Sequence, residues 1–407
     1  MPNSVGVRKN MNIINLPEAV ENVIKQLEAA GYEAYAVGGC VRDCLLGLTP
    51  YDWDVTTSAP PEKTMSIFGK SAIPTGLQFG TVSVKSDNYV VEVTTFRTDG
   101  VYTDNRRPDS IAYASSLPED LSRRDYTINA IAYSLSGEII DPFNGIRDLN
   151  NKLIRAVGAP RERFEEDALR MFRGLRIAAK LDFSIHPNTF SAIYEKAHLA
   201  AFLSAERIKD ELKKFLVCPN TYMITCVFES GLMKSFGVGN NCPDFENLSS
   251  LPADGYSRLC AMCYLLEKEG VISGTKRFLE DLRFDRNSIK MAESVVEILT
   301  NDLPDNMVGW KRLLSSHGQD VCITAALVAK TVENFNFAFV LRQVIDSGEC
   351  WSTKSLAIDG NDLIKLGYSG KRIGEELEKL LMYVIEHPEK NQTSLLIEIA
   401  KQDLADN

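Results

Sequence analysis

The sequence predicts an α+β fold in which a mixed head is followed by an all-helical remainder. Strand and helix patterns alternate up to about residue 145, whereas apolar repeats with helical spacing run from about residue 161 to 401. A chain of 407 residues also exceeds the roughly 250–300 residues that one hydrophobic core usually serves. We therefore expect a head over residues 1–150 and three helical parts over 151–235, 236–305 and 306–407.

The head is expected to begin with a helix between Pro17 and Gly31, because apolar residues recur there with helical spacing. A strand over 34–37 then runs into two glycines, and a helix follows over 41–46. The proline pair at 60–61 marks the start of another helix. The remaining strands are expected over 52–55, 81–84, 90–96 and, as a pair, between 127 and 141, with a polar loop over 97–108.

The composition is that of a globular protein without a membrane span. Hydrophobic residues make up 44% of the chain and charged residues 25%, which is ordinary for folded domains. The apolar stretch 321–329 is far shorter than the ~20 residues of a membrane helix, and the polar N-terminus does not resemble a signal peptide. Nine cysteines without regular spacing are typical of reduced thiols. We expect a cytoplasmic protein with no membrane partner, and no protein partner is implied.

The net charge of −10 argues at first against a nucleic-acid partner, but the charge is unevenly distributed. Residues 121–180 contain eleven Lys and Arg and eight Asp and Glu, so this segment is positive within an acidic chain. A local excess of cations is the usual footprint of a polyanion site. The segment is therefore compatible with a bound nucleic acid.

Two motifs in the head are suited to phosphate and metal. Gly38-Gly39 stands at an expected strand-to-helix turn, where backbone N–H groups can approach an anion closely. A plain turn is the alternative. Asp52 and Asp54 lie at i and i+2 of an expected strand, so both carboxylates should point to one face. Facing carboxylates repel unless a cation lies between them, and Mg²⁺ prefers carboxylate oxygen while it bridges substrate phosphates.

A third carboxylate is offered by Glu92, which interrupts an otherwise apolar strand. Burial of a glutamate without a partner is costly, so a buried Glu92 would be a further member of the metal site. An ordinary outward-facing position on the strand is the alternative, because strand residues alternate between the two faces of a sheet.

An arginine-rich motif precedes the last strand pair. Arg124, Asp125 and Asn129 bring a cation, an acceptor and an amide close together in the sequence. Such a mixture suits recognition of a triphosphate and a ribose, because guanidinium groups bind phosphate with charge-assisted hydrogen bonds. A solvated charged turn is the alternative.

A second charged motif opens the helical remainder. Asp167 and Arg170 lie at i and i+3, so on a helix they would share one face. Arg173 and Arg176 continue the same stretch. An ion pair on a wet helix surface is the alternative for this motif.

Together these motifs resemble those of the class II tRNA nucleotidyltransferases, the bacterial and eukaryotic CCA-adding enzymes and their poly(A) polymerase relatives. The similarity is dense over residues 33–180 and returns over 358–377. Five motifs in the family's order are not expected by chance. They are Gly38-Gly39-x-Val41-Arg42-Asp43, Asp52-x-Asp54, Arg123-Arg124-Asp125-x-Thr127-x-Asn129-Ala130, Asp141-Pro142-Phe143-x-Gly145 and Glu166-Asp167-x-x-Arg170.

The resemblance implies a polymerase-beta-like nucleotidyltransferase head followed by a helical neck, body and tail. It implies an enzyme that adds C, C and A to the 3′ end of tRNA from CTP and ATP, without a template and with Mg²⁺ as cofactor. The roles it implies are metal ligation for Asp52 and Asp54, triphosphate binding for Gly38, Gly39 and Arg42, sugar binding for Arg124, Asp125 and Asn129, and base selection for Asp167 and Arg170 with Arg173 and Arg176 beside them.

Two further segments are expected to contact RNA or respond to it. Lys371 and Arg372 follow Gly370 at an expected helix start, where cations and free N–H groups suit an RNA phosphate. An exposed basic turn is the alternative. The polar loop 98–110, with Asp104 and Arg107, is similar to the intact loop of CCA-adding relatives and could act as a lever between C and A addition. A loop that only shields the site is the alternative.

Several rival activities share these features. Related enzymes add only CC, only A, or poly(A). A catalytically inactive RNA-binding protein could use the same fold, but it would have no use for Asp52 and Asp54 facing each other beside a phosphate site. A small-molecule nucleotidyltransferase would share the chemistry of the head, although it would not need so long a helical remainder with a basic neck.

Overall fold

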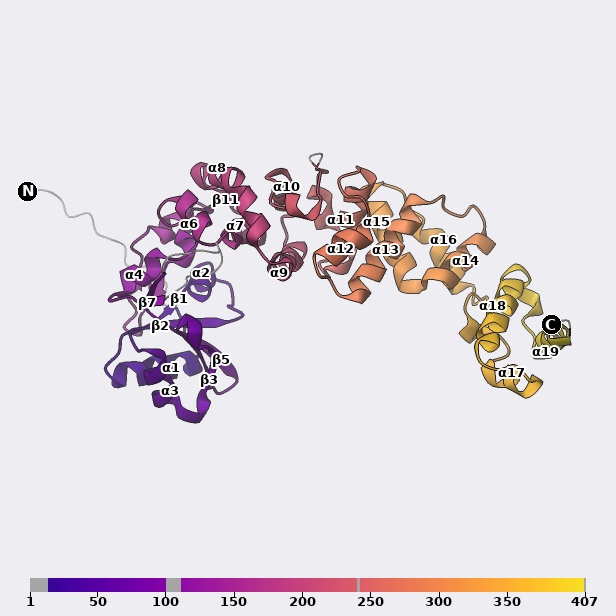
Figure 1. The fold of residues 1–407 in the computed structure, drawn as a ribbon, viewed down its shortest axis with the longest axis horizontal. Coiled ribbons are helices and arrows are strands. Elements are labelled where there is room, and N and C mark those ends of the chain that lie inside the picture. Colours follow the sequence, from indigo (N-terminus) through magenta and orange to yellow (C-terminus); the bar gives the residue numbers. More distant parts are fainter. Residues whose placement is uncertain (1–13, 100–110, 240–241, 406–407) are drawn as a thin grey trace, which may run out of the picture. The chain divides into compact units, whose positions relative to one another are not determined.

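The computed structural model describes residues 14–99, 111–239 and 242–405. It divides into two compact units, Met1–Ser235 and Phe236–Asn407, and each is described here by itself. As the sequence predicts, strands gather in the head and helices make up the rest of the chain (Figure 1). None of the helices in the described ranges combines the length and apolar character that a membrane crossing would require.

A seven-stranded mixed sheet organises the head. The strand order is β3-β4-β5-β2-β1-β8-β9, and β2 and β5 at its centre run parallel while the other neighbours are antiparallel. The bounds are β1 Ala34–Val37, β2 Trp53–Thr57, β3 Ala72–Gly76, β4 Thr81–Ser86, β5 Tyr89–Thr95, β8 Ala132–Tyr133 and β9 Ile139–Ile140.

Two helices cover this sheet, and apolar periodicity explains why. Val20, Ile24 and Leu27 recur on one side of α1 (Glu18–Ala29) and are fully buried in the same core as Val55 and Val91 of the central strands. The second helix, α3 (Pro61–Phe68), begins at the predicted proline pair and lies close to α1 (Figure 1). This core fixes the central strands on which the acidic motif stands.

Most expected elements of the head are confirmed, with local differences. The hairpin β4–β5 turns at Asp87, whose φ of 49° lies in the left-handed region that Asp tolerates in turns. The strand pair β8–β9 is preceded by a short 3₁₀ turn over Thr127–Asn129. The polar stretch expected as a loop begins instead as β6 (Arg97–Asp99), which pairs with β7 (Ile111–Tyr113). The hydrogen-bond partners of β6 lie in β7, beyond the loop, so the polarity of the segment alone could not predict this strand.

The rest of the first unit is mainly helical. A two-residue parallel pair, β10 (Leu153–Ile154) with β11 (Ser184–Ile185), is a small correction to the expected all-helical remainder. Gly174 lets α7 (Leu169–Leu181) pack closely on the head, since an added Cβ would lie 2.1 Å from the Tyr126 hydroxyl oxygen. The helices are α2 Gly39–Leu45, α4 Leu117–Ser122, α5 Gly145–Asn150, α6 Pro160–Glu166, α7 Leu169–Leu181, α8 Pro187–Lys196, α9 Ala205–Leu216 and α10 Tyr222–Glu229.

Among the described residues of the second unit, helices are the only regular secondary structure. Cys260 and Cys263 are fully buried on α11 (Tyr256–Lys268) and belong to the core. A separate apolar core that includes Leu363, Leu380 and Leu396 joins the last three helices. The helices are α11 Tyr256–Lys268, α12 Thr275–Asp281, α13 Arg286–Thr300, α14 Met307–His317, α15 Gln319–Val332, α16 Ala338–Asp346, α17 Gly360–Leu366, α18 Lys371–Glu386 and α19 Thr393–Ala405.

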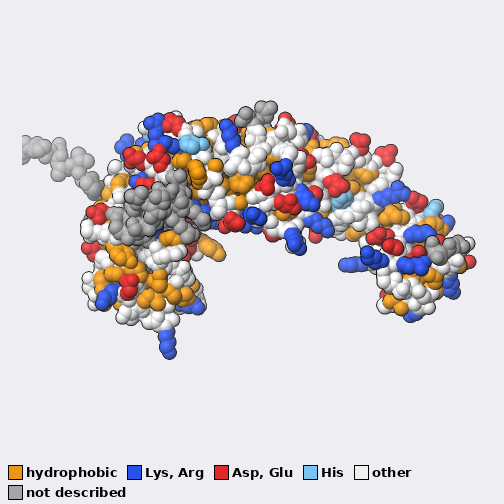
Figure 2. All heavy atoms as spheres, in the orientation of Figure 1, with side chains coloured by type: hydrophobic (Ala, Val, Ile, Leu, Met, Phe, Trp, Pro, Cys, Tyr) orange, Lys and Arg blue, Asp and Glu red, His pale blue; other side chains and the backbone are white. Residues whose placement is uncertain are grey.

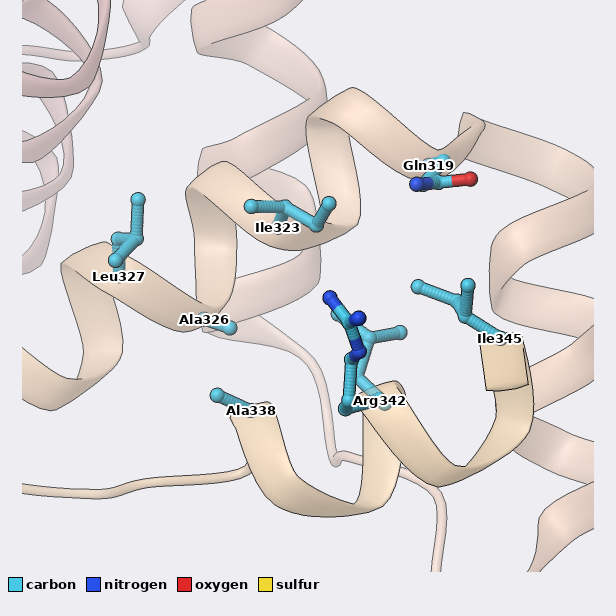
Figure 3. A pocket seen from close by; sticks show the side chains of 8 residues that line it. Gln319, Ile323, Ala326, Leu327, Ala338, Arg342 and Ile345 are labelled. Carbon is cyan, nitrogen blue, oxygen red and sulfur yellow. The ribbon is translucent and has the colours of Figure 1, made fainter. Parts of the chain in front are cut away.

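An apolar groove lies between α15 and α16 in this unit (Figure 3). Ile323 and Leu327 line it from α15, and Ile345 lines it from α16. Arg342 stands over the groove and pairs with Asp346 at 2.8 Å. Its lining carries no carboxylate, and none of the charged motifs of the head contributes to it, so the chemistry that those motifs indicate is located elsewhere.

Candidate active site

The Gly38 turn brings three of the predicted motifs together. β1 ends at Val37, and Gly38 adopts a φ of 87° that favours glycine before α2 begins at Gly39. A Cβ added to Gly38 would lie 3.0 Å from Arg124 Nη1, 3.8 Å from Asp54 Oδ2 and 3.9 Å from the Asn129 carbonyl oxygen. The glycine therefore allows a cation and a carboxylate to approach the same backbone turn.

Two carboxylates lie side by side on the central strands. Asp54 of β2 is in register with Glu92 of the parallel neighbour β5. Asp54 is partly buried, whereas Asp52 is exposed and precedes the strand, which begins at Trp53. Glu92 is also exposed, so of the two positions left open by the sequence the outward-facing one is correct, and its membership of the metal site stays a prediction. Its apolar sequence neighbours are explained by alternation, because Val91 and Val93 point into the core.

The electrostatics around Asp54 fit a bound cation. Burial raises the pKa of Asp54 to about 6, although the positive charge of Arg124 acts against this rise. The negative charges of Asp52 and Glu92 raise the pKa of Asp54 further. An ionised Asp54 is therefore costly unless a positive charge lies beside it. Oxygen ligands of this kind suit a hard divalent cation, which Asp52 and Asp54 could hold.

A buried hydrogen-bond network connects the glycine turn with the arginine-rich motif. Arg42 donates to Asp43 Oδ1 through Nε at 2.8 Å and Nη2 at 2.6 Å, and to Asn129 Oδ1 through Nη1 at 2.6 Å. Asn129 in turn donates to Asp125 Oδ1 at 3.0 Å. Arg173 of α7 donates to Asp125 Oδ2 at 2.7 and 2.8 Å. The predicted residues Arg42, Asn129, Asp125 and Arg173 thus form one chain of contacts.

Asp125 is ionised at the centre of this network. Burial alone would raise the pKa of Asp125, but the charge of Arg173 and the hydrogen bond from Asn129 outweigh it and hold the pKa well below its usual range. Asp125 also accepts from the backbone N–H of Tyr126 at 2.8 Å. A carboxylate so fully bonded is a rigid support, because each acceptor position already has a donor.

The second charged motif has a different geometry from the one expected. Asp167 lies between α6 and α7 in an extended conformation, with φ −145° and ψ 105°, so it does not share a helix face with Arg170. Its side chain accepts from the Leu169 backbone N–H at 3.0 Å and from Arg207 of α9 at 2.8 Å. Arg170 instead pairs with Glu166 and donates to the Arg123 carbonyl oxygen at 2.9 Å.

The other arginines of this region are also paired with acids. Arg176, predicted to be near the nucleotide, pairs with the buried Glu211 of α9 at 2.5 Å. Arg161 pairs with Glu195, also at 2.5 Å. On the face that Figure 2 shows, basic and acidic side chains of the described residues are interspersed. Cations of the positive segment therefore pair with acids both inside the segment, as Arg170 does with Glu166, and outside it, as Arg176 does with Glu211.

Two functional candidates were missed from the sequence. Arg207 contacts Asp167 from 40 residues away, and no local pattern indicates such a pair. Asp120, fully buried on α4, binds both Arg123 and Arg124. The signal for Asp120 was present, because i,i+3 and i,i+4 spacing places an acid beside arginines on a helical turn.

The remaining predicted residues lie in the tail and the loop. Lys371 and Arg372 begin α18 and are exposed, and the guanidinium carbon of Arg372 lies 5.9 Å from the Tyr368 ring centre. Asp104 and Arg107 fall outside the described residues.

Comparison with known proteins gives a consistent result. A family described as the poly A polymerase head domain matches residues 34–155, and the family of domain 2 of tRNA nucleotidyltransferases matches residues 260–400. A third family, the region of polymerase A to which binding of RNA and SrmB is ascribed, matches residues 182–236.

Relatives match along nearly the whole chain. The CCA-adding enzyme of Lactobacillus johnsonii is 37% identical, with 95% of this chain and 98% of that protein covered. That of Enterococcus faecalis is 36% identical, with 93% and 94% covered. The crystal structure of the Bacillus stearothermophilus CCA-adding enzyme in complex with CTP is 30% identical, with a TM-score of 0.77 and 96% and 99% of the two chains covered. The chain belongs to the family of CCA-adding enzymes, which are tRNA nucleotidyltransferases.

Proposed function

We propose that the protein adds C, C and A in turn to the 3′ end of tRNA, with CTP and ATP as substrates and without a nucleic-acid template. The observation that carries this proposal is the convergence of Asp54, Arg124 and the Gly38 turn, supported by similarity to CCA-adding enzymes over nearly the full chain. Incubation with tRNA that lacks its last three nucleotides, followed by sequencing of the ends, tests it.

The phosphate side of the reaction is assigned to the turn. Backbone N–H groups at the start of α2 provide positive charge where a triphosphate would lie. The resemblance implied sugar binding for Arg124, but its guanidinium lies against the Gly38 turn, so we assign it to the phosphates instead. Arg42 and Asn129 hold this turn against the arginine-rich motif. Asn129 donates to Asp125, which Arg173 holds in turn, so the Asn129 amide is fixed beside the turn, where we place the sugar.

The family generally uses a divalent metal, and we assign Mg²⁺ to Asp52 and Asp54, with Glu92 beside them. When bound, such an ion lowers the pKa of an attacking hydroxyl and stabilises charge on the phosphates. The protein contributes the carboxylate oxygens and a fixed strand position for Asp54. Arg124 stabilises negative charge on the same side of the turn.

Base selection is assigned to Asp167 and Arg170. Asp167 can accept a hydrogen bond from the exocyclic amine of cytosine or adenine, and Arg170 can donate to ring acceptors. Uracil and guanine present oxygen where Asp167 needs a donor. The pairs Arg207–Asp167 and Glu166–Arg170 would hold the two side chains apart, so that both face a base instead of each other.

We expect the protein to be located in the cytoplasm.

The tail is assigned to tRNA binding. Lys371 and Arg372 stand at the start of a 16-residue helix without a side-chain cap or an acidic residue in its first turn. The N–H groups and the two cations therefore remain available to an RNA phosphate.

A further inference from the structure

Asp120 occupies a buried position between the catalytic strand and the arginine-rich motif. Its side chain is fully buried, and Oδ2 accepts from the Thr56 hydroxyl at 3.1 Å. Thr56 stands two residues after Asp54 on β2. Oδ1 accepts from the backbone N–H of Arg97 at 3.4 Å, where β6 begins. One carboxylate thus bonds to both the strand that bears Asp54 and the segment after β5.

The same carboxylate binds two neighbouring guanidinium groups. Arg123 donates to Oδ1 at 2.8 and 3.0 Å, and Arg124 donates to Oδ2 through Nη2 at 3.3 Å. Burial alone would raise the pKa of Asp120, but the charges of Arg124 and Arg123 outweigh it and keep the pKa below its usual value. Asp120 is therefore a charged group that the fold encloses together with its partners.

Arg124 is held by Asp120 on one side and faces the site on the other. While Nη2 contacts Asp120, Nη1 lies 3.0 Å from the position of a Cβ on Gly38. Its Nε has no hydrogen-bond partner among the residues that the structure describes. A guanidinium group presents five N–H donors in a fixed plane, so anchoring one edge determines where the others point.

We propose that Asp120 is a positioning residue that fixes Arg124 at the Gly38 turn, where Arg124 contacts the triphosphate of the incoming nucleotide. Without this anchor, the guanidinium can turn towards the nearby Asp54, and the phosphates lose a preoriented donor. The role of Asp120 is thus exerted through Arg124 and not through Arg123. This inference rests on the proposed use of nucleoside triphosphates at the turn.

A double-mutant cycle on nucleotide binding tests the proposal. CTP dissociation constants are measured for the wild type, Asp120→Asn, Arg124→Met and the double variant, together with melting temperatures. Asp120→Asn keeps the shape of the side chain but removes its charge. We expect each single change to weaken CTP binding about tenfold, and the double variant to match Arg124→Met within about twofold, because both remove the same interaction.

Matched variants separate a positioning role of Asp120 from a general loss of stability. Asp148 is also buried and binds a threonine hydroxyl, that of Thr127, and an arginine, Arg155. Asp148→Asn should leave CTP affinity within twofold of wild type. If Asp120→Asn does not fold, Thr56→Val provides a milder change, whose smaller effect on CTP affinity should disappear in the Arg124→Met background.

Three results would overturn the inference. If the losses of CTP affinity in Asp120→Asn and Arg124→Met multiply to about a hundredfold in the double variant, the two residues have independent roles. If Asp120→Asn leaves CTP affinity unchanged, Asp120 has no role in nucleotide binding. A cycle in which Asp120 couples to Arg123→Met instead would assign the anchor to the other arginine. If the wild type neither binds CTP nor extends tRNA, the proposed function itself fails, which is a different outcome from a failed cycle.

Discussion

Asp54 and Glu92 stand in register on adjacent parallel strands, so two acids from distant parts of the sequence share one edge of the site. A partly buried Asp54 with a pKa raised to about 6 carries an electrostatic cost when it is ionised. This cost makes the stability of the metal-free protein depend on pH. The raised pKa of Asp54 determines whether stability rises or falls with pH.

The first prediction concerns stability without metal. Because the pKa of Asp54 is raised to about 6 in the folded state from an ordinary value of 3.8, the folded protein binds more protons, and this contribution to stability is lost as pH rises from about 4 to 6. Asp54→Asn should therefore stabilise the metal-free protein at pH 7.5 by about 1–3 kcal/mol, but not at pH 4.

Mg²⁺ should raise the melting temperature of wild type more at pH 7.5 than at pH 5. Equal stabilisation of wild type and variant by Mg²⁺ would contradict the assignment.

The second prediction concerns base selection. Asp167→Ala removes the acceptor that distinguishes an amine from a carbonyl on the base, so discrimination against UTP should fall by roughly 5- to 150-fold, as expected for lost hydrogen bonds of about 1–3 kcal/mol. Single-nucleotide incorporation rates with CTP and UTP measure this ratio. Glu165→Ala, which changes an exposed acid near the end of α6, is the control. Unchanged selectivity would leave Asp167 as a structural partner of Arg207 only.

The third prediction concerns tRNA affinity. Charge reversal at Lys371 and Arg372 should weaken binding of every tRNA and reduce the slope of log affinity against log salt by about 1–2. Charge reversal at Arg286 and Lys290 of α13 is the matched control. That helix start is already capped by Asp285, which accepts from the Ser288 backbone N–H at 2.9 Å. Similar salt slopes for the tail variant and wild type would exclude direct contact.

The fourth prediction concerns the change from C to A. Deletion of residues 103–108 should leave addition of CC intact and stall the final A, because the pocket must change shape between these steps. Products on tRNA ending before the CCA sequence can be resolved by length. If the deletion slows C and A addition to the same degree, the segment only shields the site.

The sequence was sufficient to predict what depends on local pattern. Amphipathic spacing placed α1, the proline pair placed the start of α3, and strand alternation placed Asp54 on β2. The same alternation decides between the two positions that the sequence left open for Glu92. Its valine neighbours suggested a buried strand residue, but they alone face the core while Glu92 faces outward.

Long-range contacts explain most of what could not be predicted. The sequence around Asp167 reads as one helix, yet the helix is interrupted there, and the Asp167 carboxylate accepts from the Leu169 N–H at the start of α7 and from Arg207. The partners of some arginines in the positive segment likewise depend on the tertiary fold, as Glu211 shows for Arg176, whereas Glu166 pairs locally with Arg170. Asp120 is different, because its spacing to Arg123 and Arg124 was visible, although its burial against Thr56 was not.

The most direct test of the account is end sequencing of tRNA that lacks its last three nucleotides after incubation with the protein, Mg²⁺ and each nucleotide mixture. The account predicts CCA with CTP and ATP together, CC with CTP alone, and little incorporation of UTP or GTP. Asp54→Ala should lower incorporation by orders of magnitude while tRNA binding persists. Addition that stops at CC, a lone A, a poly(A) tract, or near-normal incorporation by Asp54→Ala would contradict it.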